Sequence, residues 1–156
     1  GDAGLAPALK TIGKKKNTGD INFIVDCMRK RFAFSNLNQE QLEACAEMFE
    51  YGEIQKDAQL YEKGVTSRYF YVIEQGTMTI YLGDGQRTTL GAGEGFGEMT
   101  LIYTVHTSVT IIADIQSKLW YLSYPNFSFA LERYALEEIE SNRRLLDKFV
   151  FISRRV

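Results

Sequence analysis

Apolar residues recur along the chain with two different periods, and each period predicts a different kind of secondary structure. From Asp20 onward they return every three or four positions, which is typical of a helix with one buried face. The segment SNLNQEQLEACAEMF repeats this period after a helix-start motif, Asn38 followed by Gln41. Between residues 51 and 124 the pattern changes to short runs rich in β-branched and aromatic residues, separated by glycine turns. The sequence therefore predicts two helices followed by many short strands.

The two ends of the chain differ from this strand-rich middle. The first 19 residues have no hydrophobic period and predict a flexible linker or arm. After the strands the helical period returns, with Pro125 suited to a first helical turn and an apolar stripe that extends to Phe149. We therefore divide the chain into an arm (1–19), an N-terminal helical segment (20–50), a small barrel or sandwich (51–124) and C-terminal helices (125–156). Residues 20–156 are expected to form one domain.

Composition and charge narrow the class of protein. The 156 residues, 45 % of them hydrophobic, suffice for one sizeable core. A formal net charge of -2 provides no positive field for nucleic acid or an anionic membrane. No apolar run approaches the roughly 18 residues that would predict a membrane span. Cys27 and Cys45 lie in predicted helices without metal or disulfide spacing, so we expect a cytoplasmic protein with free thiols.

Motifs for catalysis and for metal binding are missing from the sequence. The single histidine, His106, has no Cys, Asp or Glu beside it at the spacing of metal ligands. A Ser-His-Asp set, a paired-carboxylate motif and a complete GxxxxGK[ST] loop are also absent. We therefore expect a regulatory domain with no catalytic residues, no metal and no cofactor, and not an enzyme.

The segment GEGFGEMTLIYTVHTSVT (93–110) is the strongest candidate for a binding site. Glycines at 91, 93, 95 and 97 permit tight turns and close approach of a ligand to main-chain N–H groups. The loop runs into EMTLIY, a predicted short helical turn whose unpaired N–H groups favour an anion. A dinucleotide-binding fingerprint would need glycine in place of Phe96, so that class is excluded. The segment contains no lysine or arginine.

The order of these elements resembles the cyclic nucleotide-binding domain of catabolite activator protein and of cAMP- and cGMP-dependent protein kinases. The resemblance covers roughly residues 32–150. FSNLNQEQLEA is similar to the first helix of the family, and YEKGVTSRYFYVIEQGTMTIY to its β-hairpin. LGAGEGFGEMTLIY is similar to its phosphate-binding cassette, and KLWYLSYPNF to the strand before its lid helices. The resemblance implies a mainly β fold with flanking α-helices, in which residues 51–124 form a jelly-roll-type β-barrel and residues 125–156 the lid helices.

The resemblance also implies a set of ligand-binding residues. These are Phe96, Gly97, Glu98, Met99, Thr100, Thr107 and Ser108. Glu98 is expected to accept a hydrogen bond from the ribose 2′-hydroxyl, while N–H groups of residues 97–100 face the phosphate. Thr107 stands where the family has an arginine, and Ser108 where cGMP-binding members often use a threonine. In the hairpin, the family's Gly-Asp pair falls on Ser67 and Arg68.

The missing arginine leaves three functional hypotheses. A charge-assisted hydrogen bond contributes about 1.5 to 3 kcal/mol, so its loss weakens binding by about one to two powers of ten. The first hypothesis is a regulatory domain of a cGMP- or cAMP-dependent protein kinase that binds cGMP or cAMP weakly, with a cation such as Arg68 supplied from elsewhere. The second is a ligand-free structural or interaction module, and the third a nucleoside-binding variant. The expected partner is a kinase catalytic domain on the same or another chain.

Overall fold

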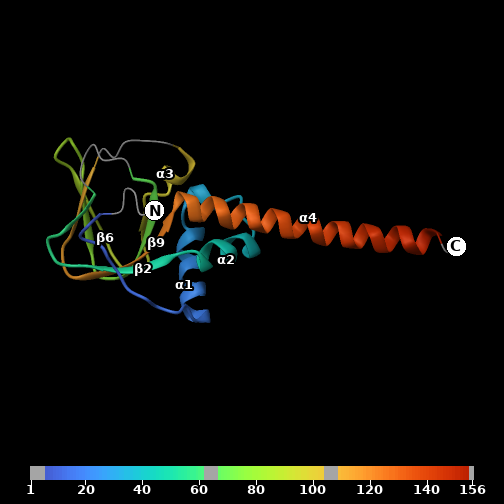
Figure 1. Ribbon diagram of the computed structural model, residues 1–156. Helices are drawn as coiled ribbons and strands as arrows, with labels where there is room; N and C mark the ends of the chain where they lie inside the picture. The colour runs from blue at the N-terminus through green and yellow to red at the C-terminus, as the bar shows by residue number, and fades with distance from the viewer. Residues whose placement is uncertain (1–5, 62–66, 104–108, 155–156) are drawn as a thin grey trace.

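The strands of the computed structural model form two antiparallel sheets (Figure 1). The structure describes residues 6–61, 67–103 and 109–154. One sheet has five strands in the order β1-β2-β9-β4-β7, and the other has four in the order β3-β8-β5-β6. The strands are β1 (Lys10–Thr11), β2 (Glu50–Ile54), β3 (Gln59–Tyr61), β4 (Tyr69–Gln75), β5 (Met78–Tyr81), β6 (Arg87–Leu90), β7 (Gly95–Phe96), β8 (Thr110–Ala113) and β9 (Ser117–Ser123).

The prediction of a mainly β fold with flanking helices is confirmed, but the predicted barrel is not closed. Among the described strands, no strand of one sheet pairs with a strand of the other. Both edge strands of the five-stranded sheet, β1 and β7, are only two residues long. Such short edges offer few hydrogen bonds with which to join the neighbouring sheet. The two sheets therefore pack face to face as a sandwich.

The five-stranded sheet is buried on both faces because its central strands alternate between two apolar clusters. Tyr71 and Tyr121 belong to the cluster between the sheets, whereas Phe70 and Trp120 belong to the cluster beneath the helices. All four side chains are fully buried. This arrangement explains why the runs YFYVI and LWYL are apolar at every position instead of alternating with polar residues.

Two helices with matching N-terminal caps cover the outer face of this sheet. They are α1 (Thr18–Arg29) and α2 (Gln39–Glu47), joined through the 3₁₀ turn η1 (Phe32–Phe34). Asn17 caps α1 and Asn38 caps α2, each within a reciprocal capping box. The cap of α2 confirms the predicted Asn38–Gln41 motif. The helix α1 begins at Thr18, and Asn17 is its N-cap because the Asn17 side chain accepts the Asp20 N–H.

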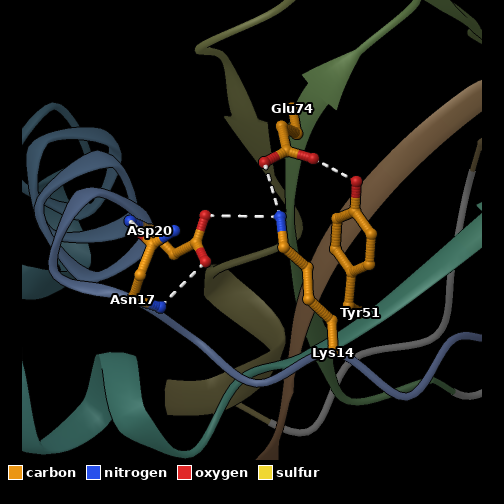
Figure 2. Close-up of polar contacts among 5 residues, drawn as sticks. All are labelled: Lys14, Asn17, Asp20, Tyr51 and Glu74. Atoms are coloured by element: carbon orange, nitrogen blue, oxygen red, sulfur yellow. Dashed lines mark hydrogen bonds and ion pairs between the residues drawn. The ribbon is translucent and has the colours of Figure 1, made fainter.

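The N-terminal arm differs from the predicted flexible linker where the structure describes it. Residues Lys10–Thr11 pair with β2, and Leu9 is buried in the sandwich core. The Lys14 ammonium lies 3.3 Å from Asp20 and 3.6 Å from Glu74, which also accepts a hydrogen bond from the Tyr51 hydroxyl (Figure 2). A lysine that pairs with carboxylates from a helix and a strand holds the arm against the domain. Hydrophobic periodicity carries no sign of such a contact, so the sequence analysis did not predict it.

The C-terminal segment forms one continuous helix, α4 (Tyr124–Arg154), in place of the predicted lid helices. Its first turns pack on the helical layer through Ala130, with Phe127 and Leu131 beside it. Beyond these turns α4 projects away from the sandwich (Figure 1). From Leu136 onward the predicted apolar stripe therefore faces solvent. Its exposed members are Leu136, Ile139, Leu145, Leu146 and Phe149, which are 61 % to 67 % exposed.

Both cysteines are buried in the helical layer, which yields a prediction about their reactivity. Burial raises the pKa of Cys27 to about 11 and the pKa of Cys45 to about 12. Near neutral pH both are therefore protonated and poorly nucleophilic. We expect iodoacetamide at about pH 8 to leave the folded protein unmodified while it alkylates both thiols of a denatured sample, as counted by intact-mass spectrometry. Equal rates in the two samples would contradict this burial.

Candidate functional site

The glycine-rich loop is held against the five-stranded sheet by close packing. β7 pairs with β4, and the Phe96 ring stacks on Tyr71 with centroids 5.2 Å apart. A Cβ atom on Gly95 would lie 2.7 Å from Cζ of Phe70 and 3.1 Å from the Tyr71 carbonyl oxygen. Since real Cβ atoms do not approach other atoms so closely, only glycine fits this position. Phe96 accordingly lies in the sandwich core.

A tight turn joins β7 to the short helix α3 (Met99–Ile102). Gly97 has a φ of 90°, in the left-handed region that favours glycine. The Thr100 hydroxyl donates to the Gly97 carbonyl oxygen at 2.7 Å, and the Thr100 N–H donates to the same oxygen at 3.1 Å. The N–H of Thr100, which by the family resemblance was expected to face a phosphate, is therefore used within the turn. The Met99 side chain is exposed.

Glu98 is a buried carboxylate with a cationic partner from another part of the chain. Its side chain is 7 % exposed, and Oε1 accepts hydrogen bonds from Arg31 Nε at 2.9 Å and from Arg31 Nη2 at 2.5 Å. A buried carboxylate requires such pairing because removal from water is costly. No residue in the described part of the chain donates to its second oxygen, Oε2.

The end of α1 contacts the loop at a second point. Lys30, the C-cap residue of α1, donates from Nζ to the Gly93 carbonyl oxygen at 3.4 Å. The Cys27 thiol donates to the same oxygen at 3.3 Å. Sequence analysis missed Arg31, Lys30 and Cys27 as neighbours of the loop, because at least 63 positions separate the partners. The only visible trace is the basic run RKR (29–31) at the end of a predicted helix.

Arg68 does not take the role that the sequence suggested for it. Its Nε donates to the Thr100 carbonyl oxygen at 2.8 Å, and Nη2 lies 3.4 Å from the Leu101 carbonyl oxygen. Its guanidinium also lies 3.6 Å from the centroid of the Tyr124 ring, at the start of α4. Arg68 therefore joins α3 to α4. The other predicted positions, Thr107 and Ser108, and the single His106, lie outside the described residues.

The Arg68 bridge yields a prediction about stability. Arg68→Gln removes a charged donor from the α3 carbonyl groups and a cation from Tyr124, so we expect a loss of about 1 to 2 kcal/mol in the free energy of unfolding. Urea denaturation measures this loss. Arg87→Gln, on the exposed strand β6, is the control because it also removes one positive charge. Its free energy of unfolding should stay close to that of the wild type. Equal stabilities of the two variants would contradict a bridging role.

These features define a class of protein: a β-sandwich that carries a glycine-rich loop, a short helix with a buried glutamate and a long C-terminal helix. The profile of the cyclic nucleotide-binding domain family matches residues 52–134, more than half of the chain. The chain belongs to this family, which confirms the resemblance found in the sequence. In the part of the chain that the structure describes, no helix is both long and apolar enough to span a membrane.

Similar proteins include regulators of cyclic nucleotide-dependent kinases. A cGMP-dependent protein kinase of Toxoplasma gondii is 24 % identical over 88 % of this chain and 14 % of its own length. A cAMP-dependent protein kinase regulatory subunit of Mucor circinelloides f. lusitanicus is 30 % identical over 76 % of this chain and 27 % of its own length. The structure of cAMP-bound PfPKA-R has a TM-score of 0.66 and 25 % identity, covering 75 % of this chain and 43 % of that one. The chain thus spans less than a third of the length of either kinase relative.

Proposed function

We propose that this chain is a regulatory cyclic nucleotide-binding domain of a cGMP- or cAMP-dependent protein kinase, with weakened ligand binding. The buried Glu98 carries the proposal. It follows Phe96 and Gly97 in the order expected of the cassette, and its Oε2 accepts no hydrogen bond from a described residue. That oxygen suits a ribose 2′-hydroxyl. Binding is weak because Thr107 offers a hydroxyl where an arginine would contribute about 1.5 to 3 kcal/mol.

The regulatory step links the loop to α4. A ligand that binds Glu98 draws residues 96–103 inward, and residues 135–149 of α4 swing toward the loop. Arg68 supports this coupling because it contacts the α3 carbonyl groups and Tyr124 together. The exposed apolar residues of α4 supply the surface that such a swing would bury. The change in exposed surface is what the catalytic domain, on the same chain or another, would detect. We place the protein in the cytoplasm.

The second candidate is a ligand-free interaction module, and the exposed face of α4 favours it. Leu136, Ile139 and Leu146 lie on a projecting helix and are each at least 61 % exposed. Exposed apolar residues that gather along one helix often mark a contact site. In this case the loop retains its fold without a ligand. A nucleoside-binding variant, in which Glu98 holds a ribose that carries no phosphate, is the third candidate.

Calorimetric titration of the whole 156-residue chain separates these candidates. The ligands are cGMP, cAMP, guanosine and adenosine, each at concentrations up to the millimolar range. Saturable binding of a cyclic nucleotide, tighter than that of its nucleoside, is the result we expect. Binding of nucleosides alone would favour the third candidate, a nucleoside-binding domain. No heat from any of the four would overturn the proposed function and favour the interaction module.

A further inference from the structure

The loop that is proposed to receive an anionic ligand is itself negatively charged. Residues 93–103 contain Glu94 and Glu98 and no lysine or arginine. A phosphate that approaches an unpaired buried carboxylate is repelled, and the repulsion is strong where water is excluded. The Glu94 carboxylate lies on the exposed side of the loop and accepts the Gly91 N–H at 3.0 Å. Glu98 is therefore the charge that must be neutralised before an anion can bind beside it.

The junction between α1 and η1 supplies that neutralisation. Arg31, the N-cap residue of η1, directs two N–H groups to a single oxygen of Glu98. A guanidinium carries five N–H donors, so three remain for another acceptor. The Arg31 side chain is 39 % exposed, compared with 7 % for Glu98, so the pair has one buried and one accessible partner. Lys30 adds a second cation at the other end of the loop, against Gly93.

We infer that Arg31 is the phosphate-recognising cation of this domain and compensates in part for the arginine that is missing at Thr107. It neutralises Glu98 through Oε1, leaves Oε2 for a ribose hydroxyl, and turns its remaining N–H groups toward the phosphate of the same ligand. The pair thus recognises a cyclic nucleotide as one unit, with the carboxylate binding the sugar and the guanidinium binding the anion. This inference rests on the proposed function, because it names the residue that selects a nucleotide over a nucleoside.

The opposite role for this contact is that Arg31 blocks Glu98, and the change in ligand affinity when Arg31 is removed distinguishes the two roles. If Arg31 only occupied Glu98 and excluded the ribose, its removal would free the carboxylate and strengthen the binding of every ligand with a 2′-hydroxyl. If Arg31 recognises the phosphate, its removal weakens the binding of cyclic nucleotides and changes the binding of nucleosides much less. The ratio of the two affinities therefore reports the phosphate contact and is insensitive to a general loss of folded protein.

The test compares the wild type with Arg31→Gln, Arg31→Lys and Arg29→Gln in calorimetric titrations with cGMP, cAMP and their nucleosides. Arg29→Gln removes an equal charge from an exposed position two residues away and serves as the matched control. We expect Arg31→Gln to lower the affinity for the cyclic nucleotide about tenfold, which is the size of one charged hydrogen bond. Its affinity for the nucleoside should change less than about threefold. The cyclic nucleotide affinity of Arg31→Lys should lie between those of the wild type and Arg31→Gln, because lysine keeps the charge and loses the two-donor geometry.

The outcomes separate this inference from the proposed function. If Arg29→Gln and Arg31→Gln lower the cyclic nucleotide affinity equally, the effect comes from the net charge alone. This result would overturn the role of Arg31. Unchanged or tighter cyclic nucleotide binding by Arg31→Gln would do the same while leaving the proposed function standing. A wild type that binds neither cyclic nucleotides nor nucleosides would overturn the proposed function, and the role of Arg31 in it.

Discussion

Glu98→Ala should lower the affinity for cGMP or cAMP by roughly ten- to a hundredfold. The substitution removes a buried carboxylate whose Oε2 is expected to accept the ribose 2′-hydroxyl, and a hydrogen bond to a charged group contributes about 1.5 to 3 kcal/mol. Calorimetry of the purified variant measures the change. Arg31 is 39 % exposed and can turn toward water when its partner is lost, so the variant should still fold.

The 2′-deoxy form of the same cyclic nucleotide is the control for this prediction. Without the hydroxyl, the wild type should lose about as much affinity as the variant does, and Glu98→Ala should bind the deoxy ligand no worse than the wild type. Glu94→Ala removes an exposed glutamate from the same loop and should leave both affinities unchanged. If Glu98→Ala binds every ligand as the wild type does, Glu98 has no part in ribose recognition.

Thr107→Arg should strengthen the binding of cyclic nucleotides by roughly ten- to a hundredfold. The substitution restores the family's arginine to the cassette, where a charge-assisted hydrogen bond to the phosphate contributes about 1.5 to 3 kcal/mol. The gain should be larger when Arg31 is already replaced by glutamine, because the two cations serve the same phosphate. Titration of the single and double variants with cGMP and cAMP measures both effects.

Thr88→Arg controls for the change in net charge, since it places the same new side chain on the exposed strand β6. It should bind cyclic nucleotides as the wild type does. A Thr107→Arg protein with no gain over this control would show that the site lacks more than one cation. In that case the ligand-free interaction module becomes the better account of the domain.

Local patterns were enough to predict most of the fold. The capping residues around Asn38 and the change of hydrophobic period near residue 51 are local features, and the structure has helices and strands in those places. The strand-rich fold was predicted, but its sheets do not close into a barrel, because closure depends on how the edge strands pair, which no short segment encodes. The predicted lid helices form the single helix α4, because no glycine or proline follows Pro125 in this segment and the helix continues to Arg154.

The candidate site was predictable only in its loop. Gly95 lies in β7, and Gly97 and Glu98 follow it in a tight turn, as their order in the sequence indicates. Their partners were not predictable, because Arg31 and Arg68 meet the loop across distances in sequence that carry no periodic pattern. Arg68, which the first hypothesis named as an example of a substitute cation, instead contacts the Thr100 and Leu101 carbonyl oxygens of α3. The cation beside Glu98 comes from the end of α1, where the sequence shows only a basic run.

Hydrogen exchange measured by mass spectrometry tests the central claim most directly, because it reports both whether a cyclic nucleotide binds and where. The wild-type chain is compared with and without millimolar cGMP or cAMP, with the matching nucleoside as reference. The account predicts slower exchange in peptides that cover residues 97–103 and in those around Arg31, and less protection by the nucleoside. Unchanged exchange in both regions at saturating cyclic nucleotide would contradict it.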